Sequence, residues 1–378
     1  MKKTTKLAIA IAILIIIVLS GCTQTPAGQV VKEEPIKIGY VGPLTGYTAS
    51  YGKSQLNALL MAVDEVNEQG GIQGKKIELV IGDSKHLPAD SVTIVRKLID
   101  IDNVKAIIGP IGSSNVMAVA PIVNQQQMPL VSPLATSPVV REAGEYVFRT
   151  MPDTALQTKK LAQYAQDNNL QRIGVIYVNN DFGAATTQAF EKHFKQTGGE
   201  IVQIETHNFA EKDFRTQLTK INNKDVDALF LASYPVESGL ILKQAKEMGF
   251  NKQIFGVETL GQKQALDVAQ ESANGIVYAI PKKLTSQDFI EKYNALYKEG
   301  MTFATDTAYD GFMLIVESMR ECGTEGPQIK ECLHKIGQNY QGVSGVITFD
   351  AKGDVDKPFA LYKIIEGESV EIDLVEDN

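Results

Sequence analysis

Polar side chains follow two of the apolar segments of this chain in a way that suits small-molecule binding. Ser113 stands where a helix is expected to begin, so its hydroxyl and the neighbouring backbone N–H groups suit an anion. Glu258 follows a later apolar segment and suits a cation, because a buried ammonium without a counter-ion costs several kcal/mol. With aromatic side chains on the neighbouring loops, the two groups describe a site for a small zwitterion: an α-amino acid with an apolar side chain.

The candidate residues lie in loops that leave the carboxyl ends of strands, where open parallel sheets bind ligands. In the first half of the chain these loops carry Tyr47, Tyr51, Ile111, Gly112, Ser113, Leu134, Ala135 and Thr136. In the second half they carry Asp181, Phe182, Tyr234 and Glu258. Taken singly, each residue has an ordinary structural role as a helix cap, a packing aromatic or a solvated charge. Together the residues are stronger evidence for a binding site than any one of them, because the strand ends at which they fall are predicted independently of them.

Short apolar strands alternate with amphipathic helices along the chain, which predicts α/β architecture with parallel sheets. The first array has expected strands at 36–42, 76–83, 106–109 and 130–132 and helices at 52–69, 89–101 and 114–126. The second has a helix at 154–168, strands at 172–178, 201–206, 228–233 and 253–257, and helices at 184–196, 214–222 and 238–248. Two similar arrays predict two Rossmann-like lobes. Helices at 287–299 and 307–320 are expected to cover the first lobe. Strands at 345–349 and 359–365 come late in the chain and are expected to dock on a lobe that earlier segments have formed.

The beginning of the chain has the pattern of a secretory signal: a basic start, an apolar run from Leu7 to Leu19, and then Ser20-Gly21-Cys22. This ending resembles a bacterial-type lipobox, in which cleavage leaves Cys22 as a lipid-bearing N-terminus. We therefore expect a signal peptide at 1–21 and a flexible, lipidated tether at 22–35. The folded part is then extracytoplasmic, anchored to the outer face of the cytoplasmic membrane. The alternative is an uncleaved anchor, but the 13 residues of the apolar run are fewer than the roughly 20 that a spanning helix needs.

Composition excludes several classes of partner and cofactor. The chain has 45 acidic and 37 basic residues, a formal net charge of −8, and no basic block, so no nucleic-acid partner is expected.

Cys322 and Cys332 flank a short Gly/Pro loop and are expected to form a local disulfide in an oxidising compartment. The alternative is two reduced cysteines in a helix pair. The 4 histidines show no metal-ligand spacing, and no metal or other cofactor is expected.

Two kinds of enzyme are disfavoured by motif spacing. Gly52-Lys53-Ser54 follows a strand and precedes a helix, as in a phosphate-binding loop, but 5 residues separate Gly46 from Gly52 where that loop needs four. A hydrolase is disfavoured because the chain has no Gly-x-Ser-x-Gly elbow and no obvious histidine partner for a serine. We therefore expect a binding protein and not an enzyme.

Several stretches of the sequence resemble type I periplasmic binding proteins of the branched-chain amino acid class. They are 38–46 (IGYVGPLTG), 66–72 (VNEQGGI), 108–110 (IGP), 132–136 (SPLAT), 148–150 (FRT), 181–183 (DFG) and 308–310 (AYD). The similarity runs from about Ile36 to the C-terminus. It implies an N-terminal lobe of 36–151 plus 281–347 and a C-terminal lobe of 152–280 plus 348–378. Three hinge crossings, near Met151, Pro281 and Thr348, would join the lobes.

The resemblance also implies how the head group of the ligand would be held. Ser113 and Thr136 would bind the carboxylate, together with the backbone of Leu134 and Ala135. Thr136 would also help to receive the ammonium, with Glu258 as its counter-ion.

The resemblance places other residues around the side chain of the ligand. Tyr234 would lie beside Glu258, Tyr51 and Phe182 would wall the side chain, and Ile111 and Gly112 would shape the floor of the pocket. The family often has tyrosine where this chain has Phe182, and a bulkier residue where it has Gly112. Both departures concern the preferred side chain and leave the binding of the head group untouched.

The function implied by the resemblance is that of the substrate-binding protein of an ABC transporter. Such a protein, expected to be a monomer, captures an apolar, branched-chain amino acid by closure of its lobes and delivers it to a membrane permease. One open alternative is a sensory module that docks a membrane receptor. Another is a ligand without an α-ammonium, such as an amide, urea or an aromatic acid, although Glu258 counts against it.

Overall fold

The computed structural model describes residues 34–282 and 284–372. The expected signal peptide, Cys22 and almost all of the expected tether therefore lie outside the described residues. Within the described ranges, no helix combines the length and the apolar character that crossing a membrane requires.

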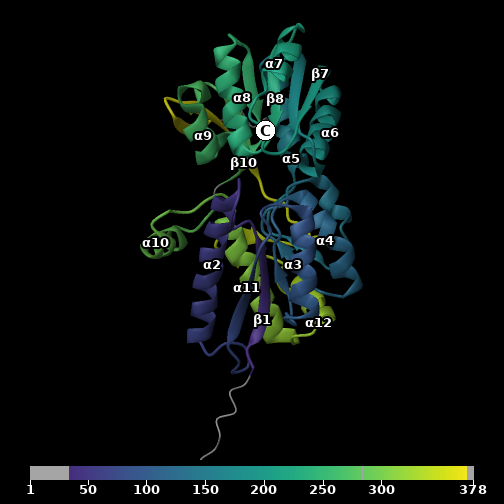
Figure 1. Cartoon of the computed structure of the whole chain (residues 1–378), viewed down its shortest axis with the longest axis vertical. Helices are drawn as coiled ribbons and strands as arrows, with labels where there is room; N and C mark the ends of the chain where they lie inside the picture. The colour runs from purple at the N-terminus through teal and green to yellow at the C-terminus, as the bar shows by residue number, and fades with distance from the viewer. Residues whose placement is uncertain (1–33, 283, 373–378) are drawn as a thin grey trace, which may run out of the picture. The chain divides into compact units, whose positions relative to one another are not determined.

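The first lobe is built on a five-stranded parallel sheet of apolar strands in the order β2-β1-β3-β4-β5. Its strands are β1 (Ile36–Gly42), β2 (Ile77–Asp83), β3 (Ile107–Ile108), β4 (Leu130–Ser132) and β5 (Val147–Arg149). Such strands need helices on both faces. One face packs against α2 (Ala49–Glu68), α11 (Thr305–Cys322) and α12 (Gly326–Ile336) (Figure 1). The other face packs against α3 (Pro88–Asp100) and α4 (Ser113–Gln125).

The second lobe is built on a seven-stranded sheet in the order β14-β13-β10-β9-β8-β6-β7. Its strands are β6 (Arg172–Val178), β7 (Glu200–His207), β8 (Ala228–Ala232), β9 (Gln253–Gly256), β10 (Val277–Pro281), β13 (Phe359–Ile365) and β14 (Glu368–Glu371). One face packs against α5 (Thr154–Asp167) and α6 (Asp181–Gln196), and the other against α7 (Arg215–Asn222), α8 (Pro235–Glu247) and α9 (Lys263–Ala269). The α/β class with a parallel-sheet core in each of two lobes is thus confirmed; β13 and β14 are antiparallel additions at one edge.

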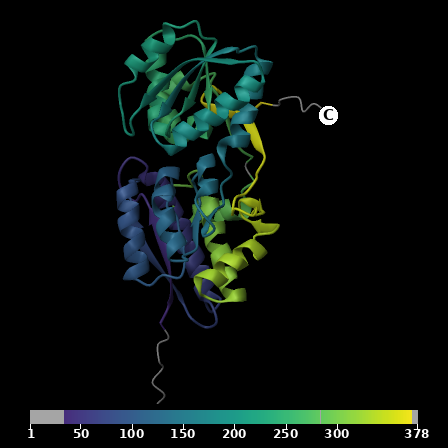
Figure 2. The ribbon, with the colours of Figure 1, turned by 90° about the vertical axis from the view of Figure 1, so that its right-hand side faces the viewer.

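The chain passes between the two sheets after β5, after β10 and before β13. After β10 it forms α10 (Gln287–Leu296), which packs on α2. A small hairpin follows α12 and consists of β11 (Tyr340–Gly342) and β12 (Gly345–Ile347). Phe349 and Val355 belong to the core of the first lobe, so the third crossing comes after Val355 and not near Thr348. Figure 2 shows the last strands, in yellow, returning to the second sheet.

A buried arginine joins the end of β5 to the returning chain and to a loop at the carboxyl end of β4. Arg149 is 0% exposed, and its Nε and Nη2 donate to the carboxylate of Asp354. Its Nη2 also lies 3.2 Å from Asp153 Oδ2. Its Nη1 donates to the carbonyls of Ala135, at 2.9 Å, and Ser137, at 2.8 Å. A buried guanidinium needs partners of this kind because its desolvation is costly.

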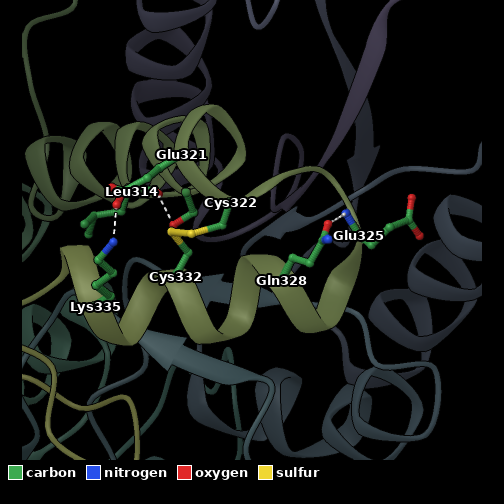
Figure 3. Close-up of a disulfide and its surroundings, with 8 residues drawn as sticks. Leu314, Glu321, Cys322, Glu325, Gln328, Cys332 and Lys335 are labelled. Atoms are coloured by element: carbon green, nitrogen blue, oxygen red, sulfur yellow. Dashed lines mark hydrogen bonds and ion pairs between the residues drawn. A yellow bond between two sulfur atoms is a disulfide. The ribbon is translucent and has the colours of Figure 1, made fainter.

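A disulfide ties together two helices that cover the first sheet (Figure 3). Cys322 ends α11 and Cys332 lies in α12, with their Cα atoms 6.1 Å apart. Lys335 pairs with Glu321 across the same two helices. The cysteines therefore occupy a helix pair and are bonded in it.

We expect Asp354→Ala to lower the free energy of unfolding by about 3 kcal/mol, because it leaves Arg149 buried without its main counter-ion. Urea denaturation measures the change. Asp267→Ala is the matched control: Asp267 is exposed and pairs with Lys263 at the surface, so its loss should change stability by less than about 0.5 kcal/mol. Equal effects of the two substitutions would contradict the role assigned to Asp354.

Replacing Cys322 and Cys332 together with serine should lower the free energy of unfolding by about 2 to 3 kcal/mol, since the bond closes a short loop in the unfolded chain. Urea denaturation of the double variant measures the loss, and the native protein with a reductant is the control. The reductant should shift the native protein and leave the double variant unchanged. A native protein indifferent to the reductant would contradict the expected contribution.

Candidate ligand-binding site

A small cavity of about 40 Å³ lies where loops from the carboxyl ends of both sheets meet. Its walls include nine of the ten residues expected from the sequence: Tyr51, Ile111, Gly112, Ser113, Leu134, Thr136, Phe182, Tyr234 and Glu258. The structure therefore brings together side chains that lie up to 207 positions apart in the sequence. The other lining residues are Thr48, His86, Pro235, Thr259, Gln262 and Phe303.

Ser113 and Thr136 form one polar side of the cavity. Ser113 is the first residue of α4, and its Oγ accepts a hydrogen bond from the backbone N–H of Ser137 at 3.1 Å. The hydroxyl hydrogen of Ser113 is thus left to donate toward a ligand. The start of a helix adds partial positive charge from its first N–H groups. This side of the cavity suits an anion.

Ala135 is the expected residue that does not line the cavity. It is buried, and its carbonyl accepts a hydrogen bond from Arg149. Because Arg149 also holds the carbonyl of Ser137, the backbone on either side of Thr136 is fixed from behind. Ala135 therefore shapes the loop that presents Thr136.

Glu258 supplies a buried carboxylate on the opposite lobe. It follows β9 and is only 4% exposed. Its Oε2 accepts a hydrogen bond from Gln157 Nε2 at 2.7 Å, and the same nitrogen donates to the carbonyl of Ala279. Burial raises the pKa of Glu258, while the bond from Gln157 favours its ionised form and opposes the rise. A carboxylate in this state is a strong partner for a cation, because a positive charge relieves its desolvation.

Aromatic rings form a wall beside the carboxylate. Phe182 and Tyr234 are stacked with their centroids 5.6 Å apart. The Tyr234 hydroxyl accepts a hydrogen bond from Asn180 Nδ2 at 3.2 Å. Tyr51 is buried, and both its burial and the nearby Glu258 raise its pKa well above the usual range. Phenylalanine at position 182 makes this part of the wall apolar.

Direct hydrogen bonds join the lobes at the edge of the site. The backbone N–H of Asp181 donates to Ser114 Oγ at 3.2 Å, and Ser137 Oγ donates to the carbonyl of Asp181 at 3.0 Å. The lobes are therefore in contact around the cavity.

His86 is the most consequential residue that the sequence interpretation missed. It lies in the loop after β2 and is 9% exposed, and burial lowers its pKa to about 4. The ring is therefore neutral near pH 7. Applying the strand-end rule to the expected strand at 76–83 would have pointed to this loop. Phe303, by contrast, precedes α11 and carries no such signal.

Nearly the whole described part of the chain is similar to proteins of a known family. A family model described as periplasmic binding protein matches residues 35–368. The leucine-, isoleucine-, valine-, threonine- and alanine-binding protein of Pseudomonas aeruginosa is 25% identical over 345 residues, covering 89% of this chain and 92% of the relative. The Leu/Ile/Val-binding protein of Escherichia coli K12 is 25% identical over 343 residues, with the same coverage.

A solved structure gives the same result. The branched-chain amino acid transporter substrate-binding protein LivJ of Streptococcus pneumoniae, in complex with isoleucine, is 28% identical. It aligns with a TM-score of 0.80 over 90% of this chain and 100% of that chain.

Gln157→Leu should raise the pKa of Glu258 further, because it removes the hydrogen bond that favours the ionised carboxylate. A ¹³C NMR titration of protein labelled at the glutamate side-chain carboxyl carbon, with Glu258 assigned by substitution, measures the change. Gln163→Leu is the control, since Gln163 bonds only to exposed neighbours on its own helix. A Glu258 titration curve unchanged by Gln157→Leu would contradict the proposed contact.

Proposed function

The chain belongs to the periplasmic binding protein family, and from that premise we propose that it captures a small apolar α-amino acid for an ABC transporter. The observation that carries the proposal is the placement of buried Glu258 on a cavity that Ser113 and Thr136 line from the other lobe. One side of the cavity suits a carboxylate and the other an ammonium. The relatives named for leucine, isoleucine and valine support the choice of an apolar amino acid.

The roles of the residues follow from the charges that each side presents. Ser113 and Thr136 hold the carboxylate with hydroxyl groups and with the N–H groups at the start of α4. Glu258 neutralises the ammonium, and Gln157 holds its carboxylate in place. The side chain of the ligand lies among apolar and aromatic groups.

Binding couples to closure of the lobes because the ligand contacts both. In an open arrangement each lobe offers only half of the contacts, so the ligand shifts the equilibrium toward closure by its differential affinity. Closure also removes water from the carboxylate and so strengthens its attraction for the ammonium. The segments after β5, after β10 and before β13 are the hinges in this scheme.

The proposal also includes the way in which the protein is attached to a membrane. The lipobox-like Ser20-Gly21-Cys22 supports a lipid anchor on the outer face of the cytoplasmic membrane, with 22–35 as the tether. The folded part works there as a monomer, and its partner is a membrane permease. Within the described residues, the strand memberships support lobe boundaries at 36–151 plus 281–355 and 152–280 plus 356–372 better than a crossing at Thr348.

A thermal-shift panel of natural amino acids tests this function, because a ligand that binds only the native state raises the melting temperature. We expect apolar amino acids to stabilise the protein and their analogues without an ammonium to have little effect. Glu258→Gln should weaken binding by about 2 to 5 kcal/mol in titration calorimetry, since it removes one partner of a buried ion pair. Ser113→Ala should cost less, about 1 to 3 kcal/mol.

The control for Glu258→Gln is Glu271→Gln, which alters an exposed carboxylate of the same lobe and should leave affinity unchanged. A Glu258→Gln variant that binds as tightly as the native protein would refute the role of this residue. Stabilisation by aromatic acids but by no amino acid would refute the proposed class of ligand.

A further inference from the structure

We propose that His86 limits the length of the ligand side chain, so that the site favours short aliphatic amino acids over long and aromatic ones. This inference rests on the proposed function and assigns a specificity-determining role within it. It is carried by the position of the imidazole, by the contacts that immobilise it and by its close approach to Gly112.

The strand order places His86 on the β2 side of Ser113, opposite to Thr136. Along the carboxyl edge of the first sheet, the loop after β2 carries His86, the loop after β3 carries Ser113 and the loop after β4 carries Thr136. Strands β2 and β4 are separated by β1 and β3, and neighbouring strands lie about 4.8 Å apart. A ligand that is held at Ser113 and Thr136 and whose side chain extends toward β2 therefore meets His86.

Contacts on three sides immobilise the imidazole of His86. Its Nδ1 lies 3.1 Å from Thr48 Oγ1, and its Nε2 lies 3.1 Å from the hydroxyl of Tyr234. Its face stacks on Phe209 with centroids 5.5 Å apart and an angle of 16° between the planes. Tyr234 and Phe209 belong to the other lobe, so closure clamps the ring in place. Both nitrogens are occupied, and the ring therefore meets a ligand as a fixed steric limit.

Gly112 shows how closely the ring approaches the floor of the pocket. A Cβ added at Gly112 would lie 2.6 Å from His86 Nε2 and 2.8 Å from His86 Cε1, well inside contact distance. The φ of Gly112 is +86°, which also disfavours a side chain. The imidazole thus occupies the space that a side chain at position 112 would fill, and it does so from the loop after β2.

The test compares the native protein with His86→Ala by calorimetry, using alanine, valine, leucine, methionine and phenylalanine. Truncation of the ring opens space at the end of the pocket. We expect the affinity for phenylalanine relative to valine to rise by about tenfold or more, the scale on which pockets discriminate methylene groups. His86→Asn, which shortens the side chain but keeps it polar, should shift the ratio in the same direction by less, and serves if His86→Ala fails to fold.

His193→Ala is the control, because His193 lies on α6 and does not line the cavity. It should leave the affinities for all five amino acids, and therefore their ratio, unchanged. If His86→Ala weakened the binding of all five amino acids equally and left the affinity for phenylalanine relative to valine unchanged, the inference would be overturned. His86 would then serve only as a contact between the closed lobes. Failure of the native protein to bind any of the five would overturn the proposed function instead.

Discussion

The buried ion pair between Arg149 and Asp354 is the interaction on which the site most depends. Arg149 ends the edge strand of the first sheet, and Asp354 lies in the segment that returns from the hairpin. The same guanidinium holds the carbonyls on both sides of Thr136. One desolvated cation thus fixes the sheet edge, the returning chain and a loop that presents a polar group to the cavity. Because a buried guanidinium is costly to leave without partners, these parts of the structure depend on one another.

The cavity itself depends on complementarity between two separate sheets. The first lobe supplies hydroxyls and a helix start, which carry partial positive charge, and the second supplies a carboxylate whose pKa burial has raised. Neither half is a complete site. Two aromatic rings of the second lobe meet His86 of the first lobe, so the apolar contact between the lobes lies beside the polar groups of the cavity.

Much of the fold and of the cavity lining could be predicted from the sequence, because both follow from local rules. Apolar runs of strand length predicted most strands of both sheets, and the strand-end rule predicted Ser113, Thr136 and Glu258. The helix expected at 184–196 in fact begins at Asp181, since the Asn180 side chain caps it. The ring of His86 was missed because its importance lies in contacts with Gly112, Tyr234 and Phe209 from other elements. That Ala135 does not line the cavity could not be predicted either, because its carbonyl is held by Arg149, which belongs to another strand.

The order in which the first lobe is assembled has a consequence for the life of the chain. Its sheet is made from the earliest segments, but α11, α12 and Phe349, which cover one of its faces, are among the last. During synthesis that face is covered by α2 alone until nearly the whole polypeptide exists, so the N-terminal core cannot be completed early. A chain proposed to leave the cytoplasm through its leader benefits from this delay, since a translocation channel passes an unfolded polymer more readily than a finished domain.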